Sequence, residues 1–221
     1  ALSSQFFLNK VKKVDRYKAA HTGLSVGVPG TVAGLLYAEH HYGRLGSAKV
    51  IDPAIHLAAD GIQVTQSLAR ALRGSTKTLS VDPATLTIFS TKKGRLVQQG
   101  DRLFRPHLAH ALLLIKKQGG KAFYRGLIAH ALIKTIKAHS GIMTLKDLKD
   151  YHVLVRKPLS FVFHGYNVLV PPPPSSGITL LELLKMSTHF AFAKGGVDQN
   201  TAQAFHLMVE TMNFAFHDRN Q

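Results

Sequence analysis

Residues 159–177 read LSFVFHGYNVLVPPPPSSG, and this stretch decides the fold class. β-Branched and aromatic residues fill two runs around the dipeptide His164-Gly165, a composition that favours two strands joined by a tight turn. Pro158 lies directly before the first run, where a strand begins or where a sheet has an edge. The sequence therefore predicts a β-hairpin over about 159–170.

Four consecutive prolines, residues 171–174, follow the predicted hairpin. Each proline fixes its own φ angle and disfavours helix at the preceding residue, so we expect an extended segment here. A helix is predicted over about 178–186, after Ser175, Ser176 and Gly177. The two serines are the strongest candidates for a nucleophile, but no Gly-x-Ser-x-Gly pattern surrounds them. We interpret both serines as helix N-caps.

The rest of the sequence carries mainly helical punctuation. Helices are predicted over about 29–42, 52–61, 65–74, 106–119, 122–138, 144–151 and 201–218, most of them bounded by a capping residue, a proline or a glycine. Asp52 and Pro53 are interpreted as an N-cap and the first helical residue. Thr144 and Asp147 have the spacing of a capping box. The chain is therefore expected to be mainly helical, with one β-hairpin near 159–170.

Two helices carry apolar stripes that are expected to face the core. In the helix over about 122–138 the stripe consists of Leu127, Ile128, Ala131 and Leu132. In the last helix it consists of Phe205, Met208, Val209, Met212 and Phe216. Core packing explains this helical spacing better than a cofactor site does. Residues 75–101 are the expected long surface excursion.

Residues 23–34, GLSVGVPGTVAG, are rich in glycine. They lack the Lys-Ser/Thr ending of a phosphate loop and the glycine spacing of a dinucleotide site. Closely spaced glycines let one backbone approach another or adopt a positive φ. We expect one of these structural reasons here, followed by a helix that begins at Pro29 and runs to Tyr42.

The composition, 221 residues of which 45% are hydrophobic and 18% charged, is that of a globular protein with one domain or a piece of one. The chain contains no cysteine, which excludes disulfides, cysteine nucleophiles and thiolate metal sites. No run of about 18 apolar residues occurs, so no transmembrane segment is predicted. Residues 1–13 lack the cationic start and apolar run of a signal peptide.

The formal net charge of +16 favours acidic partners such as nucleic acid, an anionic membrane surface or an acidic chain. The densest basic clusters are short and lie in residues 10–18 and 116–125. No glycine-arginine repeat, zinc-finger spacing or RNA-recognition motif accompanies them. We interpret these charges as solvated surface and expect no nucleic-acid partner. Polyanion binding is the alternative, and a steep salt dependence of DNA or heparin retention would reveal it.

The 13 histidines and 12 carboxylates give no metal or acid–base motif. His107 and His110 are spaced to share a helix face, but no His-Glu-x-x-His occurs. Glu39 lies beside His40 and His41, but this group has no third ligand in view. Several carboxylates, such as Asp52 and Asp147, have structural explanations as helix caps. No metal, no cofactor and no catalytic residue is therefore predicted. The residues alone indicate a basic, mainly helical α/β protein.

Several segments, taken in order, carry a more specific pattern. They are Gly23–Gly34 followed by Tyr42 and Gly43, Asp52–Gly61, Gly141–Leu148 through Tyr151, Gly165 with Tyr166, Pro172–Gly177, and Asp218 with Arg219. Together they resemble the large subunit of the γ-glutamyltransferases, also called γ-glutamyltranspeptidases or glutathione hydrolases. The order and spacing agree from about residue 23 to residue 219, which is nearly the whole chain.

The resemblance implies an α/β (α+β) fold, the large-subunit part of an N-terminal nucleophile hydrolase with an αββα sandwich. In that family a zymogen cleaves itself autocatalytically into two subunits. The new N-terminal threonine of the small subunit attacks the γ-glutamyl amide of glutathione or a related compound. The γ-glutamyl group then passes to water or to an amino-acid acceptor. The resemblance thus implies glutathione metabolism, a small-subunit partner from the same precursor, and a periplasmic or secreted location.

The sequence departs from the family pattern in three ways. No Thr-Thr-His segment is present, the family's substrate-binding arginine motif would lie before Ala1, and Ile178 stands where a second glycine is usual. Residues 1–221 are therefore expected to form a partial large-subunit domain, truncated at both ends. The chain alone is expected to lack the catalytic threonine and to be inactive.

The proline-serine-glycine motif is the one site element that the resemblance indicates. Its residues are Pro172, Pro173, Pro174, Ser175, Ser176 and Gly177. We expect the motif to lie near the substrate side of the sandwich and to support the site indirectly. The alternatives are a cephalosporin or poly-γ-glutamate acylase on the same scaffold, or a non-catalytic remnant. The presence of a threonine nucleophile in the downstream sequence would exclude the remnant.

Overall fold

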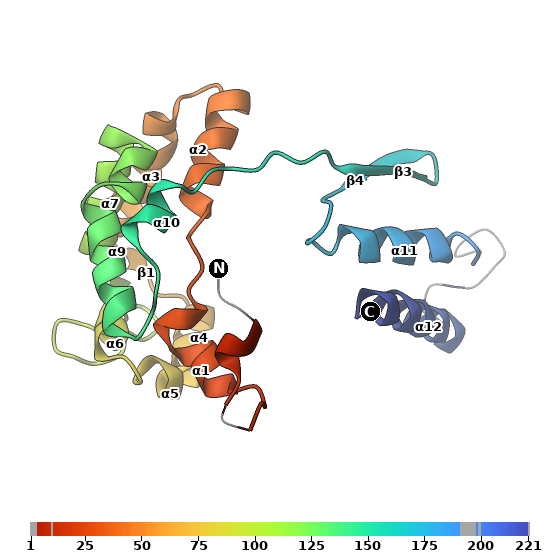
Figure 1. Ribbon diagram of the computed structural model, residues 1–221, viewed down its shortest axis with the longest axis horizontal. Coiled ribbons are helices and arrows are strands. Elements are labelled where there is room, and N and C mark those ends of the chain that lie inside the picture. Colours follow the sequence, from red (N-terminus) through yellow and green to blue (C-terminus); the bar gives the residue numbers. More distant parts are fainter. Residues whose placement is uncertain (1–3, 10, 191–197, 199, 221) are drawn as a thin grey trace. The chain divides into compact units, whose positions relative to one another are not determined.

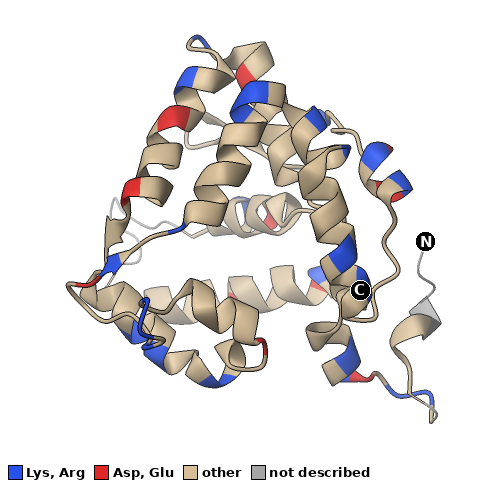
Figure 2. Ribbon diagram, turned by 90° about the vertical axis from the view of Figure 1, so that its left-hand side faces the viewer, with Lys and Arg blue, Asp and Glu red and all other residues tan. Residues whose placement is uncertain are grey.

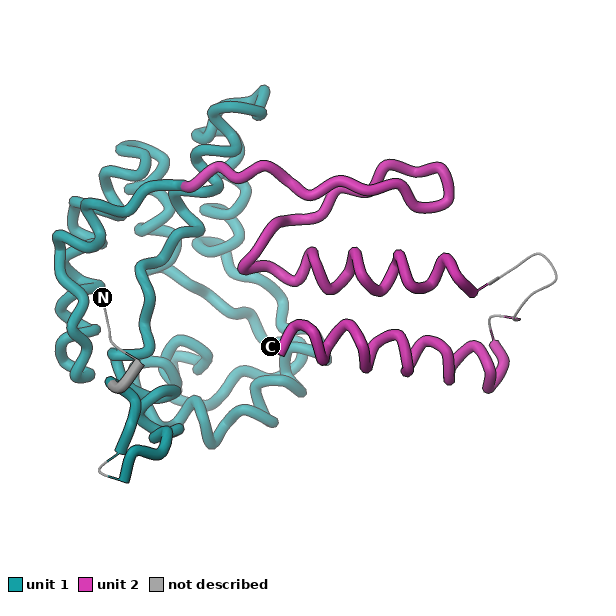
Figure 3. Tube along the Cα trace, turned by 45° about the vertical axis from the view of Figure 1, so that its right-hand side comes forward, with its two compact units in different colours: residues 1–153 teal, residues 154–221 magenta. Residues whose placement is uncertain are grey.

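The computed structural model describes residues 4–9, 11–190, 198 and 200–220. The chain forms two compact units, residues 1–153 and 154–221, which Figure 3 colours separately. The described residues are mainly helical and contain two small antiparallel sheets (Figure 1). None of the helices in these ranges is both long and apolar enough to cross a membrane.

The first unit contains ten α-helices and one short sheet among its described residues. The helices are α1 (Arg16–His21), α2 (Thr31–Tyr42), α3 (Ser47–Asp60), α4 (Gln66–Gly74), α5 (Thr76–Leu79), α6 (Pro83–Ile88), α7 (Pro106–Gln118), α8 (Gly120–Tyr124), α9 (Leu127–Ala138) and α10 (Leu145–Lys149). The sheet pairs β1 (Ile62–Gln63) with β2 (Arg102–Leu103), and short 3-10 helices cover Ser4–Phe7 and Gly23–Ser25.

Two apolar clusters form the core of the first unit. One consists of Tyr124, Ala129, Ile133, Ile136, Met143 and Leu148, from α8, α9, α10 and the loop before α10. The other consists of Val64, Ala69, Leu72, Val97 and Leu103, around α4 and β2. Two of the predicted helix caps in this unit are confirmed. The Thr65 hydroxyl accepts a hydrogen bond from the Leu68 N–H, and Thr144 and Asp147 form the expected capping box.

Helix α3 corrects the prediction for Asp52 and Pro53. The helix begins at Ser47, so Pro53 lies inside it and Asp52 is not its N-cap. Instead, the Asp52 carboxylate forms an ion pair with Lys116 of α7, against which α3 packs. Because α3 packs along α7, the helix begins six residues, nearly two turns, before Pro53, where local signals would begin it. Gly61, with a φ of 80°, ends the helix as predicted.

The predicted helix over 122–138 is broken at Arg125 and Gly126, and its buried face was predicted wrongly. Leu127 is 73% exposed, and the buried residues of α9 are Ala129, Ile133 and Ile136. The predicted and the observed buried residues both recur at helical spacing. The sequence pattern therefore showed that one face of the helix is buried, but not which face. The position of α8 and α10 decides which face is buried.

Residues 75–101 lie largely at the surface, as predicted, but they are folded. They contain α5, α6 and an isolated bridge between Ser90 and Leu96. Val97 is only 1% exposed, and Phe89 and Leu96 pack around its cluster. The segment is therefore attached to the apolar cluster around α4 and β2 through Val97 and its neighbours.

Close backbone approach explains Gly23, the first residue of the glycine-rich segment. The Gly23 N–H donates to the His139 carbonyl oxygen at 2.7 Å, and a Cβ on Gly23 would lie 2.5 Å from the Ile136 carbonyl oxygen. None of the four glycines in 23–34 has a positive φ. Helix α2 begins at Thr31, two residues after Pro29.

Tyr124 caps helix α2 from a distant part of the chain. Gly30 occupies the N-cap position of α2 and has no side chain that can accept a hydrogen bond. The Tyr124 hydroxyl accepts from the Ala33 N–H at 3.1 Å and donates to the Pro29 carbonyl oxygen at 2.7 Å. Burial raises the pKa of Tyr124 above its ordinary value of 10.0, so the phenol keeps the proton that it donates.

We expect Tyr124→Phe to lower the free energy of unfolding by about 1–2 kcal/mol, because the substitution leaves two backbone groups without their partner. Urea unfolding at neutral pH measures this difference. Since the folded pKa of Tyr124 is raised, the contribution is present below about pH 10 and is lost as the pH rises through the raised pKa. Tyr42→Phe, at the exposed far end of α2, is the control. Equal effects of the two substitutions would contradict the capping role.

The second unit is layered. Strands β3 (Leu159–Phe163) and β4 (Tyr166–Val170) pair from Leu159 with Val170 to Phe163 with Tyr166. The turn has positive φ at His164 (48°) and Gly165 (83°), which is typical of a type I′ turn. The predicted hairpin is confirmed. Helix α11 (Gly177–Ser187) packs between this hairpin and helix α12 (Ala202–Arg219), as Figure 1 shows.

The apolar stripe of α12 is not in the core, contrary to the prediction. Phe205 is 59% exposed and Val209 52%, and the other three large residues of the stripe are also exposed. The buried residues of α12 are the small ones, Ala204, Thr211 and Ala215. Small side chains let α11 approach α12 closely, and the large residues Phe205, Val209 and Phe216 remain exposed. Among the described residues of the second unit, nothing covers this apolar face.

Candidate functional site

The proline-serine-glycine motif joins β4 to α11 in the second unit. The Ser175 N–H donates to the Pro172 carbonyl oxygen at 3.2 Å, which turns the chain into the helix. The Arg156 guanidinium donates from Nη1 to the Pro173 carbonyl oxygen at 2.7 Å. A cation therefore anchors the proline run from the segment that precedes the hairpin.

The interpretation of both serines as helix N-caps is confirmed only for the position of Ser176. Ser176 occupies the N-cap position of α11, but its side chain makes no capping hydrogen bond. Its ψ of 16° departs from the extended conformation in which an N-cap side chain reaches the first turn. Ser175 lies one residue outside the helix. Both serines instead line a pocket.

This pocket, of about 340 Å³, brings together two motifs that lie about 40 residues apart. It is lined by Pro173, Pro174, Ser175, Ser176, Ile178, Thr179, Glu182, Asp218 and Arg219. The start of α11 and the end of α12 meet here because the two helices pack side by side (Figure 3). The motif at 172–177 and the Asp218-Arg219 pair, separate in the sequence, thus form one site.

Charged and hydroxyl groups dominate the polar part of this pocket. No ion pair among the described residues involves Glu182, Asp218 or Arg219, so their charges face solvent or a ligand. The Arg219 guanidinium lies 5.8 Å from the centre of the Phe216 ring, which holds it by a cation–π contact. None of the lining residues is a histidine or a lysine. The pocket can hold a polar, charged group, and the potential bases among its lining residues are the carboxylates of Glu182 and Asp218.

Sequence reasoning did not assign Glu182, Thr179 or Asp218 and Arg219 to a site. Glu182 follows Ile178 by one helical turn, so its place on the same face was readable once the start of α11 was known. The Asp218-Arg219 pair carried a signal, since it belongs to the family pattern. Its contact with the start of α11 depends on helix packing, which the sequence did not give.

Gly177 has no room for a side chain. A Cβ at this position would overlap the Pro171 carbonyl oxygen and would lie 3.1 Å from the Val170 Cβ. Both neighbours belong to the end of β4 and the proline run, so the first turn of α11 closes directly onto the hairpin. Glycine is therefore required for the turn that shapes the pocket.

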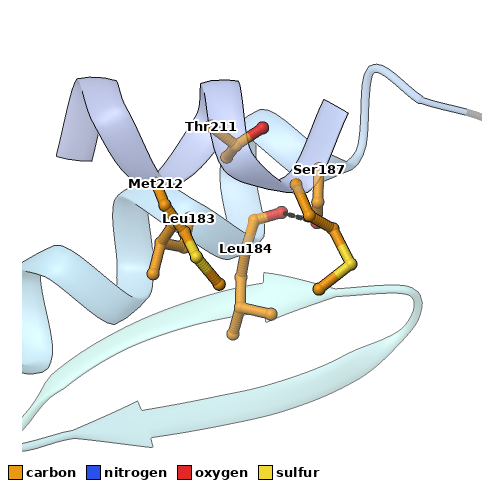
Figure 4. A pocket seen from close by; sticks show the side chains of 6 residues that line it. Leu183, Leu184, Ser187, Thr211 and Met212 are labelled. Atoms are coloured by element: carbon orange, nitrogen blue, oxygen red, sulfur yellow. Dashed lines mark hydrogen bonds between the residues drawn. The ribbon is translucent and has the colours of Figure 1, made fainter. Parts of the chain in front are cut away.

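A second, smaller pocket of about 160 Å³ lies between α11 and α12 and is apolar. In Figure 4 the Leu184 side chain points towards the hairpin, and the Ser187 hydroxyl donates to the Leu184 carbonyl oxygen at 2.7 Å. Met208 and Met212 of the exposed stripe also line this pocket. The Ser187 hydroxyl, which lines this pocket from α11, is bound to a carbonyl of its own helix. We therefore interpret the pocket as a packing gap next to the apolar face of α12.

Metal ligands do not gather in the parts of the chain that the structure describes. Groups of three or more His, Asp or Glu that could hold an ion do not occur there. His107 and His110 are exposed on α7 and have no third ligand beside them.

The comparisons with known proteins agree on one family. The sequence profile described as gamma-glutamyltranspeptidase matches residues 1–221. The chain is 35% identical over 221 residues to a glutathione hydrolase proenzyme of Pseudomonas sp. (strain A14). This match covers 100% of this chain and 38% of that protein. It is also 37% identical over 202 residues to the capsule biosynthesis protein CapD proenzyme of Bacillus anthracis. This second match covers 89% of this chain and 35% of that protein.

A solved structure gives the same answer for the fold. The crystal structure of Helicobacter pylori gamma-glutamyltranspeptidase matches with a TM-score of 0.93 and 31% identity, over 99% of this chain and 62% of that one. This confirms the predicted fold class, the large-subunit part of an N-terminal nucleophile hydrolase. The chain spans little more than a third of the length of the curated relatives it matches. It belongs to the gamma-glutamyltranspeptidase family, of which it is a large-subunit portion.

Proposed function

We propose that the complete protein containing this chain is a γ-glutamyltransferase and glutathione hydrolase. It cleaves the γ-glutamyl amide of glutathione and transfers the group to water or to an amino-acid acceptor. The observation that carries this proposal is the match to a glutathione hydrolase proenzyme along the whole of this chain. The family profile, which also covers every residue, supports it.

The proposed chemistry needs a nucleophile that residues 1–221 do not supply. A threonine at the N-terminus of a small subunit, released when the precursor cleaves itself, attacks the γ-glutamyl carbonyl carbon. Its own α-amine accepts the hydroxyl proton, because an unactivated hydroxyl is a weak nucleophile. The C–N bond of the amide breaks, and the leaving amine takes the proton from the threonine α-ammonium group, which leaves the γ-glutamyl group as an ester on the threonine oxygen. Water or an acceptor amine then attacks this ester, loses a proton to the α-amine and receives the γ-glutamyl group, and the threonine hydroxyl is restored. The proenzyme names of the relatives support such processing.

The part of this chain in the proposal is to shape and support the site. Gly177 and the Arg156 anchor fix the turn at 172–177 on the hairpin. The turn presents Ser175 and Ser176 to the same pocket as Arg219. This motif thus acts on the site through its shape and position, and no catalytic residue is assigned to it.

The proposed partner is the small subunit of the same precursor. The exposed stripe of α12 is a large apolar face, of the kind that marks a protein interface. We propose that the small subunit covers this face, and that the two compact units of residues 1–221 are parts of one large-subunit domain completed by it. Exposed Phe205 and Val209 would then lie in the interface rather than in solvent.

The decisive experiment compares the complete coding sequence with residues 1–221 alone. The complete protein is expected to mature into two chains and to release glutamate from glutathione. Residues 1–221 alone are expected to release none above background, since the nucleophile is elsewhere. Glutamate release and mass spectrometry of the purified material measure both outcomes. The proposal is contradicted if residues 1–221 alone turn over glutathione at an enzyme-like rate. It is also contradicted if the downstream sequence contains no threonine nucleophile.

A second candidate function is an acylase on the same scaffold, acting on a cephalosporin or on poly-γ-glutamate. The observation that favours it is the similarity to the crystal structure of a cephalosporin acylase from Bacillus halodurans, with a TM-score of 0.79 and 27% identity. This match covers 93% of this chain, less than that of the glutathione hydrolase relative. Turnover measured on glutathione, poly-γ-glutamate and a cephalosporin separates the two, because the proposed function requires glutathione to be cleaved at least as well as the others.

A further inference from the structure

The first unit contains a pocket of about 700 Å³ that the proposed function does not use. It is lined by Leu86, Thr87, Ser90, Thr91, Lys92, Gly94, Arg102, Phe104 and Pro106. All of these residues come from one stretch between α6 and the start of α7. The volume falls in the range of pockets that hold small organic molecules.

Apolar side chains form one wall of this pocket. Leu86, Phe104 and Pro106 line it, and Phe104 is 51% exposed. The Phe104 ring rests against the end of α3, since a Cβ on Gly61 would lie 2.9 Å from its Cδ1 atom. The ring is thus held at its inner edge and offers its remaining surface to a ligand.

Two cations also line the pocket, and one of them stands beside Phe104, because a Cβ on Gly61 would lie 3.0 Å from the Phe104 Cε1 atom and 3.1 Å from the Arg102 Cγ atom. The two cations are Lys92 and Arg102, and no acidic side chain lines the pocket. The Arg102 Nε donates to the Gly61 carbonyl oxygen at 3.3 Å, which positions the guanidinium and leaves its terminal nitrogens for other partners. No ion pair among the described residues involves either cation.

The nearby carboxylates are occupied elsewhere. Asp101 forms an ion pair with Arg95 at 2.9 Å and accepts from the Gln98 N–H at 2.7 Å. Asp82 accepts from the N–H groups of Ala84 and Thr85 as the cap of α6. Neither neutralises the pocket. Most of the basic excess lies in this unit, which holds 23 of the 28 Lys and Arg residues but 8 of the 12 Asp and Glu residues.

Figure 2 marks these positions, with Lys and Arg in blue along many helices and loops of the chain. Lys10, part of the basic cluster predicted over 10–18, lies outside the described residues. General surface charge alone attracts any anion. The pocket differs because two cations and an aromatic side chain line it together.

A tight turn holds Lys92 at the pocket. The Thr91 N–H donates to the Arg95 carbonyl oxygen at 2.7 Å, and the Gly94 N–H donates to the Thr91 carbonyl oxygen at 2.9 Å. Gly94 has a φ of 79°, which this turn requires. The hydroxyls of Thr87 and Ser90 donate to carbonyls of their own helix, so the cations are the main donors to a ligand.

We propose that this pocket binds a small organic anion, a phosphate or carboxylate group carried on an apolar body. The acidic group lies between Lys92 and Arg102, where charge-assisted hydrogen bonds are strongest. The apolar body lies against Phe104 and Leu86. The proposal does not depend on the γ-glutamyl activity.

Phenyl phosphate is the probe, titrated into the complete protein and measured by calorimetry. Saturable binding at one site is expected. Arg102→Gln is expected to weaken it about tenfold, because it removes a charge-assisted hydrogen bond. Lys92→Gln, a change of an exposed side chain, is expected to weaken it in the same direction. Lys93→Gln is the matched control, since Lys93 is next in the chain but does not line the pocket.

Two further ligands separate the pocket from general charge. Benzyl alcohol, which has the ring without the acid, and inorganic phosphate, which has the acid without the ring, are both expected to bind more weakly than phenyl phosphate. Equal weakening by Lys93→Gln and Arg102→Gln would overturn the proposal, as would equal binding of benzyl alcohol. An absence of saturable phenyl phosphate binding would overturn it as well.

Discussion

Gly177→Val is expected to abolish maturation of the complete protein, or to lower its γ-glutamyl turnover about 10- to 100-fold. The valine Cβ would overlap the Pro171 carbonyl oxygen, and both are fixed, one by helix α11 and the other by the end of the hairpin. The backbone must shift to relieve the overlap, at a cost of about 3 kcal/mol. That shift moves Ser175 and Ser176, which line the pocket. Gel analysis of precursor cleavage and the rate of glutamate release measure the effect.

Gly34→Val is the matched control for this substitution. Gly34 lies in helix α2, and a Cβ there would meet no atom within 4 Å. Valine at that position changes local propensity but produces no overlap, so processing and turnover are expected to stay within about twofold of the wild type. Normal maturation and turnover of Gly177→Val would show that the turn at 172–177 does not support the site.

Gly23→Ala is expected to destabilise the first unit by about 2 kcal/mol. The added methyl group would lie 2.5 Å from the Ile136 carbonyl oxygen and 2.8 Å from the Gly141 backbone nitrogen. Both atoms belong to backbone around the end of α9, so a change of side-chain rotamer cannot relieve the contact. The midpoint of urea unfolding measures the loss.

Gly27→Ala, four residues away in the same glycine-rich segment, is the control. No atom lies within 4 Å of a Cβ at Gly27, and its φ is not positive. Alanine there is expected to leave stability unchanged or slightly raised, because it reduces the freedom of the unfolded chain. A Gly27→Ala variant as unstable as Gly23→Ala would mean that the segment needs flexibility rather than close approach.

Local chemistry made parts of the fold predictable from the sequence. The hairpin at 159–170 follows from β-branched runs around His164 and Gly165, and the caps at Thr65 and Thr144 follow from side chains that reach only three residues. These features are fixed by contacts within a few residues, so sequence spacing is sufficient to locate them. The end of α3 at Gly61 is of the same kind.

Tertiary packing decided the features that the sequence did not give. Asp52 has the chemistry of a cap, but Lys116, 64 residues later, takes its carboxylate. The stripe of α12 has the period of a buried face, yet the helix turns small residues such as Ala204 and Ala215 towards α11. The spacing of apolar residues along a helix is a local property of the sequence, whereas the face that is buried depends on which neighbouring element packs against the helix.

The candidate site shows the same division. The motif at 172–177 was visible from its composition and from its resemblance to a family pattern. Glu182 and Arg219 were not assigned to it, because their contact with the motif requires the packing of α11 on α12. Sequence reasoning therefore found the segment that forms one side of the pocket and left the opposite side to the structure.

The Tyr124 hydroxyl has a consequence for the order in which the first unit assembles. It closes a loop of 91 residues to reach the Ala33 N–H, so the first turn of α2 has this partner only after α8 has docked. The Ala33 amide proton at the start of α2 is thus protected by a partner far away in sequence, and we expect the opening of α8 to expose it to exchange. On this basis the glycine-rich segment and α8 are expected to open as one cooperative unit, although nearly half of the chain separates them.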